Sequence, residues 1–299
     1  MTVPDLARAS ARGVCGFRIA LALLPALGCG GSAFSASGSD GGTADVDGGG
    51  TSDGGTSGGE GGTGDAGNAD AGPSYCALSG GQFDFCSDFD TGMLIPPWER
   101  QVTAGTGASS KVDATAAKSA PASLLMTTAP NTAPSGGTYP QDFLLKTGIK
   151  KQNAQLQFDL DIERVSFGGA DAVSSVILAT IAQGTDYSLS LILRPPTSGN
   201  GNAAFSLALL EVSGSTPTPH ALKPVPALGV WSHFVVDLNF NALQAAVTVQ
   251  VDANSQEKTT LSPSPGALAA TSVRSLAVGV TVTGPVADYA ARIDNVTYK

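Results

Sequence analysis

Three acidic residues alternate along one short stretch of the chain, at Asp159, Asp161 and Glu163. Alternate side chains of a β-strand point to the same face of a sheet, so all three carboxylates would share one face. Paired carboxyl groups carry out glycoside hydrolysis, and the retaining reaction needs them about 5 to 5.5 Å apart. Positions 159 and 163 would lie about 13 Å apart along a strand. The alternative is that the three acids form the solvated side of an amphipathic strand.

Other residue types that carry chemistry are sparse. The chain has two histidines, His220 and His233, and neither stands in a cluster with metal-ligand spacing. No spaced set of serine, histidine and aspartate indicates nucleophilic catalysis. The net charge is −9, and no basic stripe with interleaved aromatic residues predicts nucleic acid as a partner. These features favour a non-catalytic protein over an enzyme.

The first 29 residues are typical of an export signal. Arginines precede an apolar run over residues 19–27, which is too short to cross a bilayer as a mature helix. The run ends in Ala26-Leu27-Gly28-Cys29, which resembles the lipobox of bacterial lipoproteins, although Ala26 stands where that motif usually has leucine. The resemblance implies lipid attachment at Cys29 and a membrane anchor.

The residue after the cysteine bears on the destination. Gly30 is not the aspartate that retains lipoproteins at the inner membrane, so the resemblance implies an outer-membrane or cell-surface location. The alternative is ordinary secretion, with cleavage after Ser35.

Residues 30–74 are rich in glycine, aspartate and serine and contain few large apolar side chains. Such a segment cannot offset its ordering entropy by burying surface, so the composition predicts a disordered linker. As a flexible coil it would span roughly 35 to 40 Å. We therefore expect a signal segment over 1–29, a linker over 30–74 and one folded domain over 75–299.

Cys76 and Cys86 are the only cysteines of this expected domain. In an exported protein an isolated pair predicts a disulfide. A loop of this length contributes about 3 kcal/mol on the chain-entropy model. A zinc site would need more ligands than the sequence offers nearby.

Apolar residues recur with a period of two throughout the domain, as at Leu156, Phe158, Leu160 and Ile162. The same pattern marks residues 231–240, 247–251 and 276–282, with a turn expected at 254–256. Further strands are expected near residues 98–103, 122–128, 141–146, 173–182, 186–194, 203–213 and 287–298. Many short strands without helical periodicity predict an all-β fold, a two-sheet antiparallel β-sandwich of the jelly-roll type.

Several stretches of the domain resemble the concanavalin A-like lectin/glucanase and laminin-G-like superfamily. In chain order they are residues 84–90 with Trp98, 119–125, 229–238, 246–252 and 293–296. The resemblance implies a jelly roll with a concave face that binds glycans or proteins.

The superfamily also contains laminarinase-type glycosidases, and their Glu-x-Asp-x-Glu motif resembles residues 159–163. The resemblance gives Asp159 the nucleophile's place, Asp161 an assisting role and Glu163 the role of general acid/base. Asp159 is one methylene shorter than the glutamate of the motif.

A calcium ion is the one cofactor that the acidic residues suggest. In many sandwiches of this kind the first and last strands are neighbours and share a calcium site. Asp88 and Asp90 near the start, with Asp294 near the end, would suit that arrangement, since calcium prefers carboxylate and carbonyl oxygens.

The favoured function is a surface-displayed, lipid-tethered, non-catalytic recognition module, with a polysaccharide or cell-surface glycan as its partner. Two alternatives stay open. One is a glycoside hydrolase that uses Asp159 and Glu163, and the other is a structural envelope protein without a small ligand.

Overall fold

The structure is a computed structural model that describes residues 74–299, apart from 150–152, 169–173, 184–185, 197–203, 224, 241–244, 253–254 and 264–273. The predicted signal segment, Cys29 and the predicted linker up to residue 73 lie outside the described residues. None of the helices within the described residues is long and apolar enough to cross a membrane.

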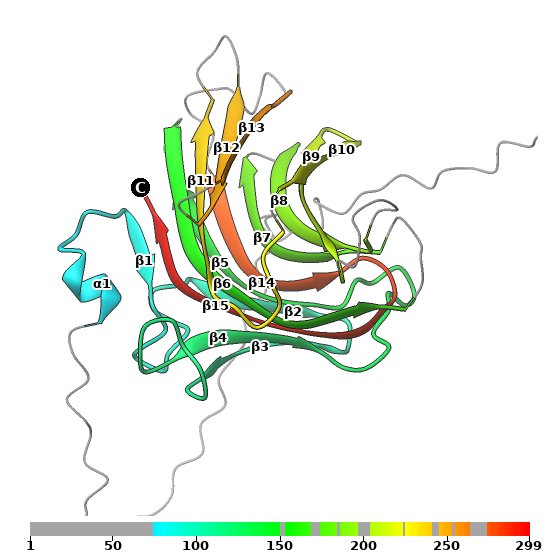
Figure 1. Cartoon of the computed structure of the whole chain (residues 1–299), viewed down its shortest axis with the longest axis horizontal. Coiled ribbons are helices and arrows are strands. Elements are labelled where there is room, and N and C mark those ends of the chain that lie inside the picture. The colour runs from blue at the N-terminus through cyan, green and yellow to red at the C-terminus, as the bar shows by residue number, and fades with distance from the viewer. Residues whose placement is uncertain are drawn as a thin grey trace, which may run out of the picture.

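Two antiparallel β-sheets make up the domain (Figure 1), which confirms the predicted sandwich. The eight-stranded sheet has the order β13-β12-β11-β6-β15-β4-β3, and β1 pairs with β15 beside this path. Its strands are β1 (Phe85–Ser87), β3 (Ala108–Asp113), β4 (Ser123–Thr128), β6 (Asn153–Phe167), β11 (Ser232–Asn239), β12 (Ala246–Val251), β13 (Ser255–Thr260) and β15 (Val286–Tyr298).

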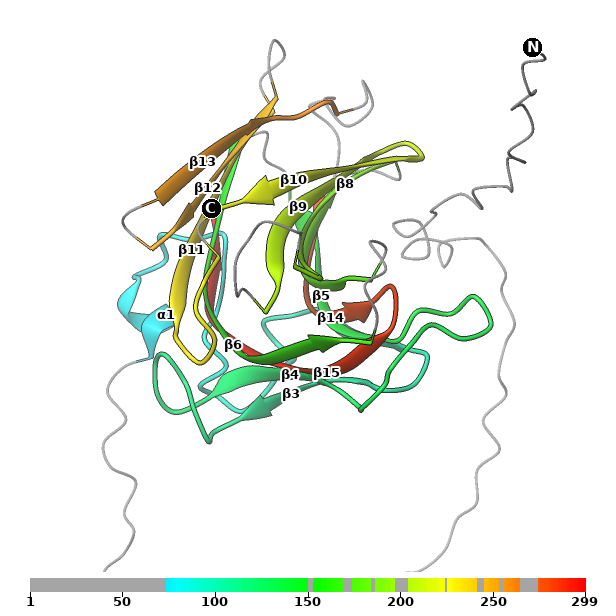
Figure 2. The same cartoon turned by 45° about the vertical axis from the view of Figure 1, so that its right-hand side comes forward.

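The seven-stranded sheet has the order β10-β9-β8-β7-β14-β5-β2. Its strands are β2 (Arg100–Ala104), β5 (Gln141–Ile149), β7 (Val176–Gln183), β8 (Tyr187–Arg194), β9 (Ser206–Ser213), β10 (Thr216–Leu222) and β14 (Arg274–Val282). Both sheets bend along their strands, and the seven-stranded sheet lies inside the arc of the eight-stranded one (Figure 2). The outer face of the eight-stranded sheet is therefore convex.

The core lies between the two sheets and is built from the alternating apolar residues. Leu156, Phe158 and Leu160 of β6 are buried there. Phe158 stacks on Phe234 of the neighbouring β11, with ring centroids 5.1 Å apart. Because successive side chains of a strand point to opposite faces, the acidic residues of β6 lie on the outer, convex face.

The first segment of the domain, residues 74–87, is joined to the last strand, and we call this segment the clasp. Helix α1 (Tyr75–Leu78) is capped by the side chain of Ser74. The predicted disulfide between Cys76 and Cys86 is confirmed, with the two Cα atoms 5.7 Å apart. Residue pairing between β1 and β15 also confirms that the first and last strands are neighbours.

Three strands, β3, β10 and β13, have no counterpart in the predictions, and one predicted turn overlaps a strand. Strand β10 contains Pro217 and Pro219, and it lies at the edge of its sheet, where a missing N–H group directed to solvent costs no ladder hydrogen bond. Strand β3 is mostly polar and lacks alternation. Strand β13 begins at Ser255, so Ser255 and Gln256 of the predicted turn belong to a strand, and Asn254 lies outside the described residues.

Candidate functional site

The predicted acidic trio lies on the convex face of the eight-stranded sheet, and each acid has different surroundings. Asp159 is bound by two side chains from neighbouring strands. His233 Nδ1 lies 2.9 Å from its Oδ1, and Asn295 Nδ2 donates to its Oδ2 over 2.8 Å. The carboxylate of Asp159 is therefore fixed in orientation by β11 and β15.

The other two acids lie near a buried arginine. Glu163 Oε1 accepts a hydrogen bond of 2.6 Å from Arg292 Nε, and Arg292 also donates to Asp113 over 2.9 Å. Burial, followed by the negative charge of Glu163, raises the pKa of Asp161. Asp159 and Glu163 are each engaged with basic or amide partners. Asp159 and Asp161 are buried, so they do not form the solvated strand face that the alternative interpretation expected.

His233 gives the convex face a pH-dependent contact. Its hydrogen bond to Asp159 raises the pKa of the imidazole, against a smaller opposing effect of burial. A raised folded-state pKa stabilises the fold fully below the unfolded value of about 6.5, and this contribution is lost as the pH rises through the folded-state pKa. We expect the free energy of unfolding to decrease as the pH is raised above about 6.5.

The control is His233→Gln, which keeps a donor for Asp159 but does not titrate. Chemical denaturation of both proteins across this pH range checks the prediction. Equal pH profiles for the two proteins would contradict it.

Two acids of the predicted calcium site, Asp88 and Asp90, follow strand β1, and the third, Asp294, belongs to β15, which pairs with β1. Both carboxylate oxygens of Asp88 accept backbone N–H groups, those of Cys76 and Asp90. Asp294 accepts backbone hydrogen bonds from Lys118, Ser119 and Asn295. These bonds fix the two carboxylates in place as acceptors.

Asp90 differs from the other two, because its Oδ2 is buried and accepts no hydrogen bond. Burial and the charge of Asp88 raise its pKa to about 6. Burial also raises the pKa of Asp294 to about 7, with a further contribution from the charge of Asp90. Among the described residues, no three His, Cys, Asp or Glu side chains are arranged as a metal site. Calcium binding by these acids stays a prediction, with Asp90 Oδ2 as the oxygen best placed to contribute.

A thermal melt tests the calcium prediction. Millimolar calcium is expected to raise the melting temperature, because a cation bound only by the folded state stabilises it. Asp90→Asn should lose this rise. When a chelator removes calcium, Asp90→Asn should be at least as stable as the wild type, because it removes the repulsion between the carboxylates of Asp88 and Asp90. An unchanged melting temperature of the wild type on adding calcium would contradict the predicted calcium site.

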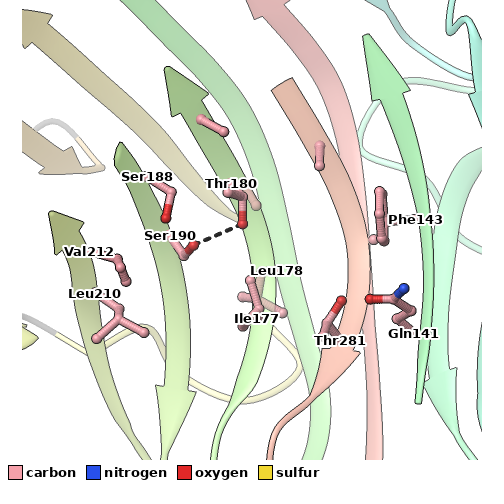
Figure 3. A pocket seen from close by; sticks show the side chains of 14 residues that line it. Gln141, Phe143, Ile177, Leu178, Thr180, Ser188, Ser190, Leu210, Val212 and Thr281 are labelled. Carbon is pink, nitrogen blue, oxygen red and sulfur yellow. Dashed lines mark hydrogen bonds between the residues drawn. The ribbon is translucent and has the colours of Figure 1, made fainter. Parts of the chain in front are cut away.

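A trough lies on the other side of the sandwich, on the outer face of the seven-stranded sheet (Figure 3). It contains about 670 Å³ of empty space when the part open to solvent is included. Its lining comes from five adjacent strands and consists of Gln141, Phe143, Ile177, Leu178, Ala179, Thr180, Ala182, Ser188, Ser190, Leu210, Val212, Ala277, Gly279 and Thr281.

Small side chains make the floor of this trough. Along one row of the sheet, Ala277, Thr180 and Ser190 are neighbours on β14, β7 and β8. The hydroxyl groups of Thr180 and Ser190 are 2.9 Å apart and form a hydrogen bond (Figure 3). Gly279 adds no side chain, and Phe143 and Leu210 belong to β5 and β9 on either side of the floor.

The lining combines apolar groups with hydroxyl and amide groups and contains no charged side chain among the described residues. Buried polar groups are stable only when hydrogen-bonded, and a buried charge without a partner is costly. The trough therefore suits an uncharged ligand with both apolar and hydroxyl surfaces. Phe143 is the only aromatic residue in the described lining. Trp98, Tyr187 and Tyr289 are instead buried in the core.

None of the trough residues was predicted from the sequence as a functional residue. A weak signal was present in strand β8, where Ser188 and Ser190 alternate with the core residues Leu189 and Leu191. Alternating serine on a strand is also typical of an ordinary solvated face, so this pattern did not distinguish a site.

No family model matches the chain, and no curated protein matches it in sequence. An endo-β-1,4-glucuronan lyase from the fungus Trichoderma reesei is structurally similar, with 12% identity, a TM-score of 0.48, and coverage of 72% of this chain and 94% of that one. An alginate lyase from Klebsiella pneumoniae has 13% identity, a TM-score of 0.43, and coverage of 66% and 85%. An endo-1,3-β-glucanase from Streptomyces sioyaensis has 11% identity, a TM-score of 0.44, and coverage of 72% and 95%.

Proposed function

We propose that the domain is a non-catalytic recognition module that binds a neutral glycan in the trough of the seven-stranded sheet. The observation that carries the proposal is the lining itself: hydroxyl and amide groups on adjacent strands, flanked by apolar side chains, without a charged group among the described residues. It agrees with the sequence-based expectation of a glycan as the partner.

The chemistry of a sugar ring matches this surface. A pyranose presents apolar C–H faces and a rim of hydroxyl groups, and each hydroxyl both donates and accepts hydrogen bonds. Thr180, Ser190 and Thr281 offer hydroxyl groups of the same dual character, and Gln141 adds an amide donor and acceptor. Phe143 and Ile177 offer apolar surface for the C–H face.

The described residues of the same lining lack the groups that glycoside hydrolysis needs. Glycoside hydrolysis requires two carboxyl groups beside the scissile bond, and the described lining contains no acid. The acids of β6 lie on the opposite face of the sandwich. Binding without bond cleavage is therefore the function that the trough supports.

A filling variant tests the proposal. Ser190→Trp should weaken the binding of neutral oligosaccharides at least about tenfold, which corresponds to about 1.4 kcal/mol, because the indole would occupy the floor. Ser190→Ala should weaken binding less, since it removes one hydroxyl group only. Isothermal titration calorimetry with glucose, mannose and xylose hexasaccharides measures both effects.

The matched control is Ser166→Trp, which places the same side chain at an exposed position of β6, on the eight-stranded sheet. It should bind as the wild type does. Equal affinities for Ser190→Trp and Ser166→Trp would contradict trough binding. Release of reducing ends from a polysaccharide by the wild-type protein would contradict the non-catalytic role.

The proposal also includes display at the cell surface through a lipid on Cys29 and the segment 30–74. It is supported by the lipobox-like sequence and by the composition of that segment. Mass spectrometry of the mature N-terminus tests it. A diacylated Cys29 is the expected result, and a free N-terminus after residue 35 would favour ordinary secretion.

A further inference from the structure

A second hollow lies on the convex face, across β6, β11, β12 and β13, which are adjacent in the upper part of Figure 1. It contains about 920 Å³ of empty space, much of it open to solvent. Most of its lining residues have polar or charged side chains, and the lining consists of Asn153, Ala154, Gln155, Asp237, Leu238, Asn239, Ala246, Thr248, Lys258 and Lys299. The trough of the seven-stranded sheet lies on the opposite side of the sandwich.

The strand register places four of these residues in one row. Gln155 of β6 is paired with Asp237 of β11, and Asp237 is paired with Thr248 of β12. Thr248 is paired in turn with Lys258 of β13. Neighbouring strands are about 4.8 Å apart, so the row extends about 14 Å across the sheet. It is long enough to contact several linked sugar rings.

The row is held in a defined arrangement at its β6 end. Gln155 Nε2 donates a hydrogen bond of 2.6 Å to Asp237 Oδ1. Gln157 Nε2 donates to Gln155 Oε1, so the amide of Gln155 is oriented on both sides. The backbone of Gln155 also forms two hydrogen bonds with Lys299, of 2.8 and 3.1 Å. Groups that are oriented before binding lose less entropy when a ligand arrives.

The chemical types in the row alternate in a way that suits a polyhydroxylated ligand. An amide, a carboxylate, a hydroxyl and an ammonium follow one another across the four strands. The carboxylate accepts hydrogen bonds, the ammonium donates them, and the amide and hydroxyl do both. Neighbouring hydroxyl groups of a sugar need acceptors and donors at such close spacing. The apolar surface of an acyl chain would leave these groups unpaired.

We propose that the row Gln155–Asp237–Thr248–Lys258 is a second glycan-binding site on the face opposite the trough. No residue of this site belongs to the described lining of the trough. With the trough, as proposed above, it makes the domain bivalent, so that one domain joins two glycan strands. Linking two sites in one molecule raises the apparent affinity for a multivalent surface without any new contact.

Calorimetric stoichiometry tests the second site. The probe is the hexasaccharide of the glucose, mannose and xylose panel that the wild-type protein binds most tightly. The wild type should bind two molecules per domain. Thr248→Trp, which fills the hollow, and Ser190→Trp, which fills the trough, should each bind one, and the double variant should bind none. Asp237→Asn should weaken the convex site by about tenfold, because it replaces an acceptor by a donor.

The outcomes for the two sites are distinguishable. One bound molecule in the wild type, lost in Ser190→Trp and kept in Thr248→Trp, would overturn the second site and leave the trough. One bound molecule lost only in Thr248→Trp would overturn the trough and support the second site. No binding in the wild type would overturn both. Thermal melts of every variant show that loss of binding is not loss of folding, and Ser166→Trp is again the control.

Discussion

Replacing Gly279 with alanine is expected to lower the free energy of unfolding by about 3 kcal/mol, in the range of substitutions that force a clash in a packed core. A Cβ atom at this position would lie 2.4 Å from the backbone oxygen of Asp142 and 2.4 Å from Cα of Phe143. Both are backbone atoms of the neighbouring strand β5 and cannot rotate away. The residue also has φ of 154°, which side chains other than glycine rarely adopt.

Gly214→Ala is the matched control for this prediction. Gly214 also has positive φ, at 60°, but a Cβ atom there would meet nothing within 4 Å. It should cost only about 1 kcal/mol, the strain of a left-handed residue. Urea denaturation of both variants measures the difference. Equal costs would show that β14 and β5 separate easily, and the floor of the trough would then be less rigid than its packing indicates.

Replacing Arg292 with methionine is expected to lower the free energy of unfolding by about 2 to 3 kcal/mol. This lies at or just below the range of about 3 to 5 kcal/mol for breaking a fully buried ion pair, because the partners of Arg292 are partly exposed. The Arg292 side chain is 6% exposed and forms ion pairs with Asp113 and Glu163. It also donates to Thr115 Oγ1 over 2.8 Å. Methionine fills a similar volume but removes the cation from Asp113, and it leaves Glu163 only the longer contact of 3.7 Å with Arg164.

The pH dependence provides a second readout for this variant. Hydrogen bonds from Thr115, followed by the one from Arg292, lower the pKa of Asp113 to about 2. A lowered pKa stabilises the fold above the unfolded value of about 3.9, and this contribution is lost as the pH falls toward 2. The deficit of Arg292→Met should therefore shrink in acid.

Arg164→Met is the control for Arg292→Met. The Arg164 side chain is 51% exposed, and its ion pairs with Asp288 and, at 3.7 Å, with Glu163 are open to solvent. Exposed pairs contribute about 0 to 1 kcal/mol. Denaturation at neutral and acidic pH compares the two variants. A similar cost for both would mean that the buried network contributes little to the convex face.

Most of the fold could be predicted because burial leaves a period-two pattern in the sequence. Strand β6 shows it clearly, since Leu156, Phe158 and Leu160 face the core while acids occupy the other face. The disulfide followed from the absence of competing cysteines in the domain. Strand β10 was missed because Pro217 and Pro219 argue against a strand in any central position, and nothing in the local sequence shows that β10 lies at an edge.

The candidate sites were harder to predict, because neighbours across a sheet are distant in the sequence. Asp159 could be placed on one face of its strand, but its partners His233 and Asn295 come from two other strands whose register is not encoded locally. The trough depends on small residues such as Gly279 and Ser190, whose types are common everywhere in this chain. A hollow that is formed by small side chains has no distinctive pattern in a single sequence.

The clasp at the start of the domain has a mechanical consequence. A force applied to the chain at residue 74 reaches Cys76. The disulfide transmits this force directly to Cys86 on β1, so the segment between the two cysteines is not extended. Strand β1 is paired with β15, and β15 is also paired with β6 and β4. Load from the chain preceding the domain therefore reaches the central strands of a sheet. A module tethered at this end would resist flow or the movement of a bound polymer through its core.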